Sequence, residues 1–154
     1  MPEENKMFNV VRLINQLKAD EGSVESAQNK HVVYFDSEGY ATLGYGRLVD
    51  SKLPGSGLTD EEAMYLLRQD VTKSIDELER AFPFYKDLPG ICKEAMVNMV
   101  FNLGMPRLKK FKKMLAAIEA GDGEQAYVQA LDSKWADQVK GRATRIAEIF
   151  RENL

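Results

Sequence analysis

One segment constrains the fold of this 154-residue chain more than any other: Asp36-Ser37-Glu38-Gly39-Tyr40-Ala41-Thr42-Leu43-Gly44-Tyr45-Gly46. Asp-Ser-Glu-Gly is a turn sequence, and the residues on both sides of it are rich in aromatic and β-branched types. We therefore predict a hairpin with strands over 32–35 and 40–48. Alternation along the second strand would place Gly44 and Gly46 on one face. That face would be nearly bare of side chains, so a ligand could approach the backbone there.

The rest of the chain is helical in pattern, with apolar residues at three- and four-residue spacing and Gly or Pro between the segments. Thr59 with Glu62 three positions later forms a capping box, which predicts a helix start. The pattern predicts helices over 7–21, 59–82, 91–103, 107–120, 123–132 and 141–152. The segment from Ser133 to Lys140 is expected to connect the last two.

These elements predict a mainly helical α+β fold with two lobes in one domain, residues 1–154. A small N-terminal lobe, residues 15–60, would carry the hairpin. The helix over 59–82, roughly 30 Å long, would join it to a larger helical lobe. Residues 1–14 and 83–154 would form that helical lobe.

Composition excludes several classes of site. Cys92 is the single cysteine, so no intrachain disulfide can form, and with His31 as the single histidine a zinc site would need mostly carboxylates. We expect no metal. Cys92, Met96 and Met99 are expected in the core, and Trp135 is expected to anchor one helix to another.

Charge and hydropathy limit the partners. The formal net charge is −3, but residues 105–154 hold more basic than acidic side chains. No nucleic-acid motif accompanies that charge, so a solvated helical face is expected and nucleic acid is not. No run of about eighteen apolar residues occurs, and the acidic N-terminus is unlike a secretory signal. We expect a protein made and kept in a cytoplasm, without stable membrane insertion.

Two carboxylates lie on either side of the segment that leads into the hairpin. Glu21 ends the first predicted helix on the face of Ile14 and Leu17, where partial desolvation and the helix dipole both favour the protonated form. Asp36 opens the turn. Taken singly, each is more often an ordinary helix-end or turn residue. A protonated acid facing an ionised carboxylate is the minimal equipment for cleaving a glycosidic bond, so a glycoside hydrolase is the leading hypothesis.

The motif around these two carboxylates is a more specific signal than any of its residues taken singly. It comprises Glu21-Gly22, then Tyr34, Asp36, Gly39, Thr42, Gly44, Tyr45 and Gly46. In these residues the chain resembles the phage-type lysozymes, a family of muramidases. Three further stretches resemble that family's linking helix, central helix and C-terminal segment, in the correct order: residues 58–63, 98–104 and 133–143. The resemblance covers roughly residues 7–152 and implies a cleft between the two lobes.

The resemblance implies a role for each site residue. Glu21 would be the general acid, Asp36 would position or activate the attacking water, and Thr42 would help to hold that water. Leu43, Gly44 and Phe101 would contact substrate.

Two further roles belong to the C-terminal part of the chain. Asn102 would contact sugar N-acetyl groups, and Arg142 would neutralise charge near Glu21.

The resemblance also implies the reaction: inverting hydrolysis of the β-1,4 bond between N-acetylmuramic acid and N-acetylglucosamine in peptidoglycan, without a cofactor. The protein would be a monomeric phage endolysin that accumulates in the infected bacterium's cytoplasm. It would reach the wall after a separate protein opens the membrane. The alternative is a module that keeps the fold and binds peptidoglycan without turnover.

The chain departs from the family pattern in two places. Glu21 and Asp36 are 15 positions apart, where the family motif usually has nine, so residues 23–33 carry an insertion. The insertion should lengthen the rim of the cleft, and His31 within it is expected to be solvated. Arg47 stands where the family usually has a histidine.

Overall fold

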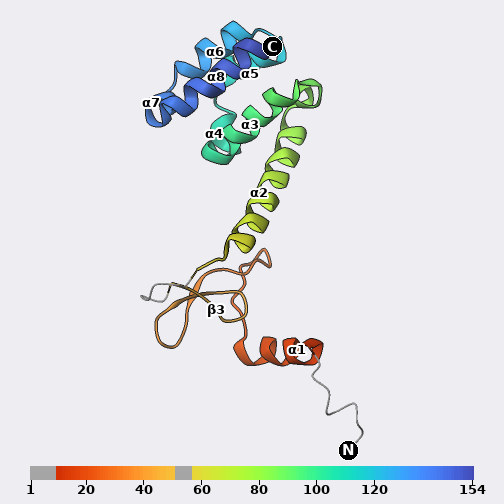
Figure 1. The fold of residues 1–154 in the computed structure, drawn as a ribbon, viewed down its shortest axis with the longest axis vertical. Helices are drawn as coiled ribbons and strands as arrows, with labels where there is room; N and C mark the ends of the chain where they lie inside the picture. Colours follow the sequence, from red (N-terminus) through yellow and green to blue (C-terminus); the bar gives the residue numbers. More distant parts are fainter. Residues whose placement is uncertain (1–9, 51–56) are drawn as a thin grey trace, which may run out of the picture. The chain divides into compact units, whose positions relative to one another are not determined.

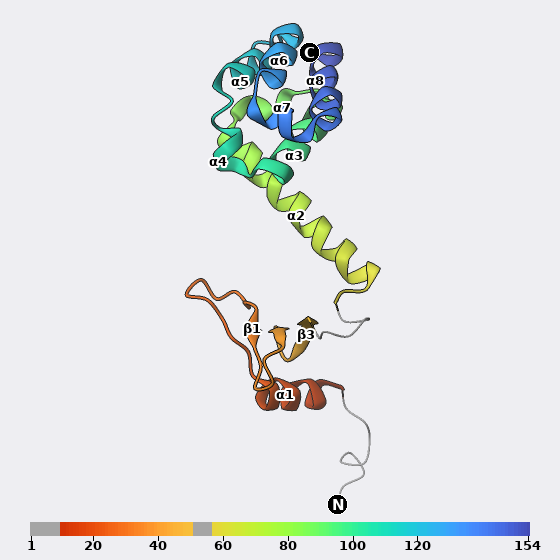
Figure 2. The same ribbon diagram turned by 90° about the vertical axis from the view of Figure 1, so that its left-hand side faces the viewer.

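The computed structural model describes residues 10–50 and 57–154, in which helices predominate over one small sheet (Figures 1 and 2). The predicted mainly helical α+β fold is confirmed. The chain divides into two compact units, Met1–Ala63 and Met64–Leu154, which we call the N-terminal and C-terminal units. The first residues of the helix predicted over 7–21 lie outside the described residues. The assignment of residues 1–14 to a helical lobe stays a prediction.

The N-terminal unit contains helix α1 (Val10–Glu21) and three antiparallel strands: β1 (Tyr34–Phe35), β2 (Ala41–Leu43) and β3 (Arg47–Asp50). The strands pair in the order β1-β2-β3. The prediction of one strand over 40–48 is therefore wrong.

A turn at Gly44–Gly46 divides that segment into β2 and β3. Gly44 has a φ of 63° and Gly46 a φ of 81°, and only glycine adopts positive φ without steric cost. The two glycines consequently form a turn instead of a bare strand face.

Residues 23–33 form a second small hairpin, which we call the inserted hairpin. The Val32 N–H donates to the Val24 carbonyl at 3.0 Å, and the Ser26 N–H donates to the Lys30 carbonyl at 2.8 Å. Asn29, with a φ of 57°, occupies its turn, and asparagine tolerates this left-handed conformation better than most residues. The insertion is thus an ordered hairpin.

The C-terminal part of the chain is helical and contains α2 (Asp60–Ala81), a 3₁₀-helix (Pro83–Asp87), α3 (Gly90–Leu103), α4 (Met105–Leu108), α5 (Lys112–Glu119), α6 (Gly123–Leu131), α7 (Lys134–Val139) and α8 (Gly141–Asn153). The helices predicted over 59–82, 91–103, 123–132 and 141–152 are confirmed to within one residue at each end. The helix predicted over 107–120 is wrong in extent, because α4 and α5 are separate.

Helix α7 lies where only a connection was expected. It has six residues, too few for an apolar period to appear in the sequence. The Ser133 hydroxyl caps it by accepting the Ala136 N–H at 3.1 Å.

A hydrophobic core occupies the C-terminal unit, where α6 packs against α8 (Figure 1). Cys92, Met96 and Met99 are fully buried, as predicted. Burial raises the pKa of the Cys92 thiol. Trp135 is buried and meets the Phe111 ring edge-on, 6.1 Å between centroids, which confirms it as a packing anchor. No helix within the described ranges combines the length and the hydropathy that a membrane crossing requires.

Candidate active site

Glu21 is the last residue of α1, and its carboxyl lies against the turn that joins β2 to β3. Gly22 ends the helix with a φ of 65°, as predicted, and its N–H donates to the Lys18 carbonyl at 3.1 Å. A Cβ built on Gly46 would lie only 2.7 Å from Glu21 Oε2. Glycine at position 46 therefore lets the Glu21 carboxyl approach the backbone of the turn.

The solvation of Glu21 differs from the expectation. Glu21, Ile14 and Leu17 are all exposed, so the partial desolvation that was predicted for this helix face is not found. What the structure provides at Glu21 is a defined neighbour in the turn.

Asp36 is held by its own turn. Its Oδ1 accepts the Glu38 N–H and the Tyr40 N–H, both at 2.9 Å, and its N–H donates to the Tyr40 carbonyl at 3.0 Å. Both side-chain bonds go to Oδ1, which leaves Oδ2 for a ligand as far as the described residues are concerned. The predicted turn residue thus presents one committed and one available carboxylate oxygen.

The side chains of Thr42 and Asp36 both form hydrogen bonds with the backbone of Tyr40. The Thr42 side chain is buried, with 3% of the residue exposed, and its hydroxyl donates to the Tyr40 carbonyl at 3.0 Å. That carbonyl also receives the Asp36 N–H. A hydroxyl has one donor and two acceptor lone pairs, so Thr42 can act toward a further group only as an acceptor.

Leu43 is the last residue of β2 and pairs with Arg47 of β3, and Gly44 follows it in the turn. A Cβ on Gly44 would meet open space, whereas one on Gly46 would meet Glu21. Of these two glycines, Gly44 is therefore the one at which a ligand can approach the backbone. The predicted substrate contact at Gly44 is compatible with this geometry, and it stays a prediction.

The remaining predicted residues belong to the C-terminal unit. Phe101 is 47% exposed and lines, with Arg142 and Asn98, an apolar cavity of about 480 Å³. Arg142 donates from Nε to Asn98 Oδ1 at 2.8 Å and from Nη2 to the Asn98 carbonyl at 3.2 Å. This pair joins α8 to α3.

Asn102 is engaged as well. Its Oδ1 accepts the Trp135 indole N–H at 2.7 Å, which links α3 to α7. Within the part of the chain that the structure describes, the Asn102 amide therefore keeps its N–H donors for a sugar. Its role toward N-acetyl groups, and that of Arg142 toward Glu21, stay predictions.

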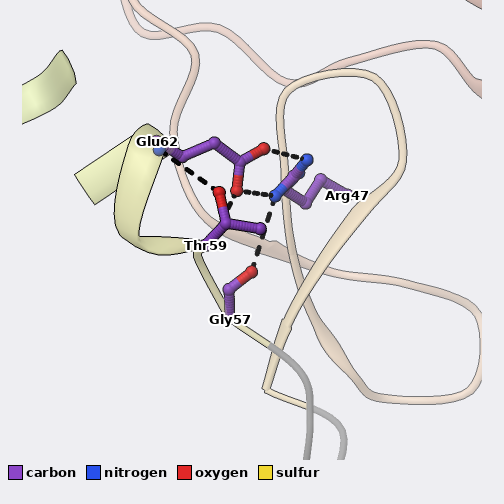
Figure 3. A network of polar contacts seen from close by, with 4 residues as sticks. All are labelled: Arg47, Gly57, Thr59 and Glu62. Carbon is purple, nitrogen blue, oxygen red and sulfur yellow. Dashed lines mark hydrogen bonds and ion pairs between the residues drawn. The ribbon is translucent and has the colours of Figure 1, made fainter. Parts of the chain in front are cut away.

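Arg47 takes part in a polar network within the N-terminal unit (Figure 3). Its guanidinium forms a two-pronged ion pair with Glu62, with Nη1 at 2.7 Å from Oε2. The capping box predicted at Thr59 is confirmed, because Thr59 N–H donates to Glu62 Oε2 at 2.9 Å and Glu62 N–H donates to Thr59 Oγ1 at 3.2 Å. The hydrogen bond from Arg47, followed by that from the Thr59 backbone, holds the pKa of Glu62 below its ordinary value.

Comparison with known proteins shows the family of this chain. A sequence model described as "Phage lysozyme" matches residues 22–149. The chain belongs to the phage lysozyme family. As a phage lysozyme it is a glycoside hydrolase by class.

Individual relatives cover it to different extents. The pre-baseplate central spike protein Gp5 of Enterobacteria phage T4 is 33% identical over 143 residues, which are 77% of this chain and 25% of Gp5. Probable T4-type lysozyme 1 of Dictyostelium discoideum is 30% identical over 162 residues, 88% of this chain and 91% of that protein. The endolysin of Bacillus phage B103 is 29% identical over 122 residues, 79% of this chain and 43% of the endolysin. The chain thus spans a quarter of the spike protein's length and nearly all of the Dictyostelium protein's.

Sequence reasoning missed two contacts at this site. One is the approach of Glu21 to Gly46, and the other is the packing of His31 against Tyr45, at 5.0 Å between ring centroids. The Gly-Tyr-Gly triplet was the available signal, because glycines on both sides of an aromatic residue are also typical of a tight turn.

Proposed function

We propose that this phage lysozyme hydrolyses the β-1,4 bond between N-acetylmuramic acid and N-acetylglucosamine in bacterial peptidoglycan, with inversion at the anomeric carbon. One observation carries the proposal: the Asp36 carboxylate and the Thr42 hydroxyl are both bonded to the backbone of Tyr40, and each keeps acceptor capacity. A water molecule has two donors, so two acceptors that share one anchor suit a single bound water.

In the proposed reaction, protonated Glu21 gives its proton to the glycosidic oxygen as the bond to the anomeric carbon breaks. Asp36 takes a proton from the water, whose oxygen forms the new bond to that carbon from the opposite side. Thr42 accepts the second hydrogen of the water and so orients it. Asp36 then releases its proton to solvent and Glu21 takes a proton from solvent, so the enzyme returns to its starting state.

Inversion sets a requirement on the assembled site. Room for a water between sugar and base requires the Glu21 and Asp36 carboxyl groups to stand roughly 6.5 to 9.5 Å apart with substrate bound, where a retaining pair needs roughly 5 to 5.5 Å. Leu43, Gly44 and Phe101 are proposed as substrate contacts, together with Asn102 and Arg142.

The biological setting is part of the proposal. The names of the relatives, lysozyme and endolysin, support peptidoglycan as the substrate. We propose a monomer that needs no cofactor and binds no nucleic acid. It would accumulate in the cytoplasm of the infected bacterium and act on the wall after a separate protein opens the membrane.

The test is to incubate the purified protein with peptidoglycan and to measure new reducing ends. Turnover supports the enzyme and excludes the alternative, a module that binds peptidoglycan without cleaving it. NMR of the first product formed should show the α-anomer, since inversion converts a β bond. Initial release of the β-anomer would overturn inversion and the water-holding roles of Asp36 and Thr42.

A matched pair of variants locates the base. Asp36→Asn should lower turnover by about a hundredfold or more, because the amide cannot take the proton. Glu38→Gln removes a charge from the same turn, where Glu38 contributes its N–H and not its carboxylate to the Asp36 bond. Glu38→Gln should retain turnover, and equal losses in both variants would remove Asp36 from the role of base.

A further inference from the structure

The Tyr45 ring is contacted by one side chain of α1 and by one side chain of the inserted hairpin. The His31 ring meets it edge-on, 5.0 Å between centroids and at an interplanar angle of 66°. The Lys18 Nζ lies over the Tyr45 ring, 5.2 Å from its centroid. Edge-to-face aromatic pairs and cation–π contacts both have preferred geometries, so together they limit where the Tyr45 ring can lie.

Most residues of the inserted hairpin are exposed to solvent. Two of its valines, Val24 and Val33, are 43% and 56% exposed. An isolated two-stranded hairpin is marginally stable at best in water. Among the contacts of the described residues, the His31–Tyr45 pair is the aromatic contact that joins this hairpin to another element.

Tyr45 lies in the turn on which Glu21 rests. Gly44 and Gly46, on either side of it, have positive φ angles. Because glycine has no side chain, Tyr45 carries the only side chain of the three turn residues 44–46. The Glu21 carboxyl lies against Gly46. A displacement of Tyr45 would therefore move the backbone that the Glu21 carboxyl contacts.

We propose that the inserted hairpin is a brace for the general acid: His31 holds the Tyr45 ring, and the turn at Gly44–Gly46 thereby keeps the Glu21 carboxyl in position. His31 and Tyr45 are positioning residues in this proposal, because neither is placed on the reacting atoms. The proposal rests on the proposed function of Glu21. It gives residues 23–33 a role in the rate of the reaction, where a longer cleft rim would affect binding of substrate.

The shape of the imidazole, and not its charge, is what the brace uses. The His31 Nε2 lies 3.8 Å from Glu25 Oε1, and both side chains are about two-fifths exposed. Exposed pairs of this kind contribute little. Phenylalanine at position 31 can keep the edge-on contact without a charge, whereas alanine cannot.

The decisive experiment compares His31→Ala with His31→Phe on soluble peptidoglycan fragments. His31→Ala should lower kcat by about tenfold with KM unchanged, the size expected for loss of one aromatic contact. His31→Phe should restore kcat to within about twofold of the unmodified protein. Glu25→Gln, the matched control on the same hairpin, should leave both constants unchanged. An unchanged kcat in His31→Ala, a rise in KM alone, or no recovery in His31→Phe would overturn the brace.

A second measurement does not depend on activity or on the folding of the alanine variant. Because His31 is the single histidine, its ring protons are assignable directly, and NOEs from them to the Tyr45 ring should appear in Glu21→Gln. Their absence from a folded protein would overturn the contact on which the brace depends.

Glu21→Gln also separates this proposal from the proposed function. If that variant turns over substrate normally, the role of Glu21 as acid fails. If it is inactive while His31→Ala is fully active, the brace alone fails.

Discussion

The two units of this protein differ in how their residues are held. Every buried hydrophobic side chain of the described residues lies between Leu78 and Phe150, in the C-terminal unit. In the described part of the N-terminal unit, Thr42 is the one side chain that is buried. The proposed acid, base and water-holding residues all belong to the N-terminal unit. Packing therefore organises one unit, and backbone geometry with local hydrogen bonds organises the other.

Glycines show the difference in detail. Gly46 has a positive φ, and the atoms nearest to its missing Cβ belong to the flexible Glu21 side chain. Gly123, at the start of α6, has an ordinary φ, but a Cβ there would lie 2.5 Å from the Phe150 carbonyl oxygen of α8. The first glycine makes room for a reactive group, and the second makes room for a neighbouring helix.

The largest effect is expected from removing the proposed acid. Glu21→Gln keeps the shape of the side chain but cannot donate the proton, so the release of reducing ends should fall by about a thousandfold. The circular dichroism spectrum should not change, because Glu21 is exposed. Asp20→Asn, one position earlier on α1, is the matched control and should keep its activity. Near-normal turnover in a folded Glu21→Gln protein would place the acid elsewhere.

The next effect tests the packed unit. Gly123→Ala should destabilise the protein by about 1–3 kcal/mol, because the backbone of α8 must move to admit the methyl group. Denaturant titration followed by circular dichroism measures it. Activity per folded molecule should stay normal, and a loss of activity without a loss of stability would contradict the division between the units.

The same substitution in the other unit should act on the reaction. Gly46→Ala should lower turnover by about tenfold, since a methyl group at 2.7 Å displaces the Glu21 carboxyl from the turn. Its strained φ of 81° should cost about 1–2 kcal/mol of stability.

A control separates strain from contact. Gly121 also has a positive φ, 69°, but a Cβ there meets open space. Gly121→Ala should therefore lose a similar amount of stability and no turnover per folded molecule. If both variants lose turnover equally, the contact between Gly46 and Glu21 has no part in the reaction.

The smallest effect concerns the ion pair between Arg47 and Glu62. Because the folded-state pKa of Glu62 is lowered, the pair stabilises the protein above the unfolded value of about 4.3, and this contribution is lost as the pH falls through the folded-state pKa. Arg47→Met should lower Tm slightly at pH 7, and the difference from the unmodified protein should vanish below both pKa values. Thermal melts across a pH series measure it.

A weaker pair serves as its reference. Arg80 lies 4.0 Å from Asp76 in a single-contact, exposed pair on α2. Arg80→Met should leave Tm unchanged at every pH. A difference that persists at low pH in Arg47→Met would mean that packing of the Arg47 stem, and not the ion pair, is responsible.

Periodicity and capping predicted most helices of this chain, because both signals are local. Thr59 and Glu62 lie three residues apart and form the predicted box. Helix α7 was not predicted, because six residues are too few to show a helical period of apolar side chains. The prediction of one strand over 40–48 was wrong for a related reason. Gly44 and Gly46 lie two positions apart, which is also the spacing of residues on one face of a strand, so the alternation did not reveal the turn between β2 and β3.

The site divides in the same way. The turn of Asp36 is predictable, since aspartate accepts backbone N–H groups two and four residues further along. Glu21 and Asp36 were predicted as a pair because the residues around them resemble a family motif, and the exposed state of Glu21 was not foreseen. Its degree of burial depends on residues distant in the sequence.

The sequence by itself determined the family, most of the helical segments and the local turn at Asp36. Only the tertiary structure decided that the Glu21 carboxyl lies on Gly46 and that His31 packs against Tyr45. The physical reason is the separation along the sequence between the residues that make each contact. Turns and caps are formed by atoms a few residues apart, so residue type and spacing specify them. A contact across 25 or 14 positions depends on the path of the chain between its ends, which no local pattern encodes.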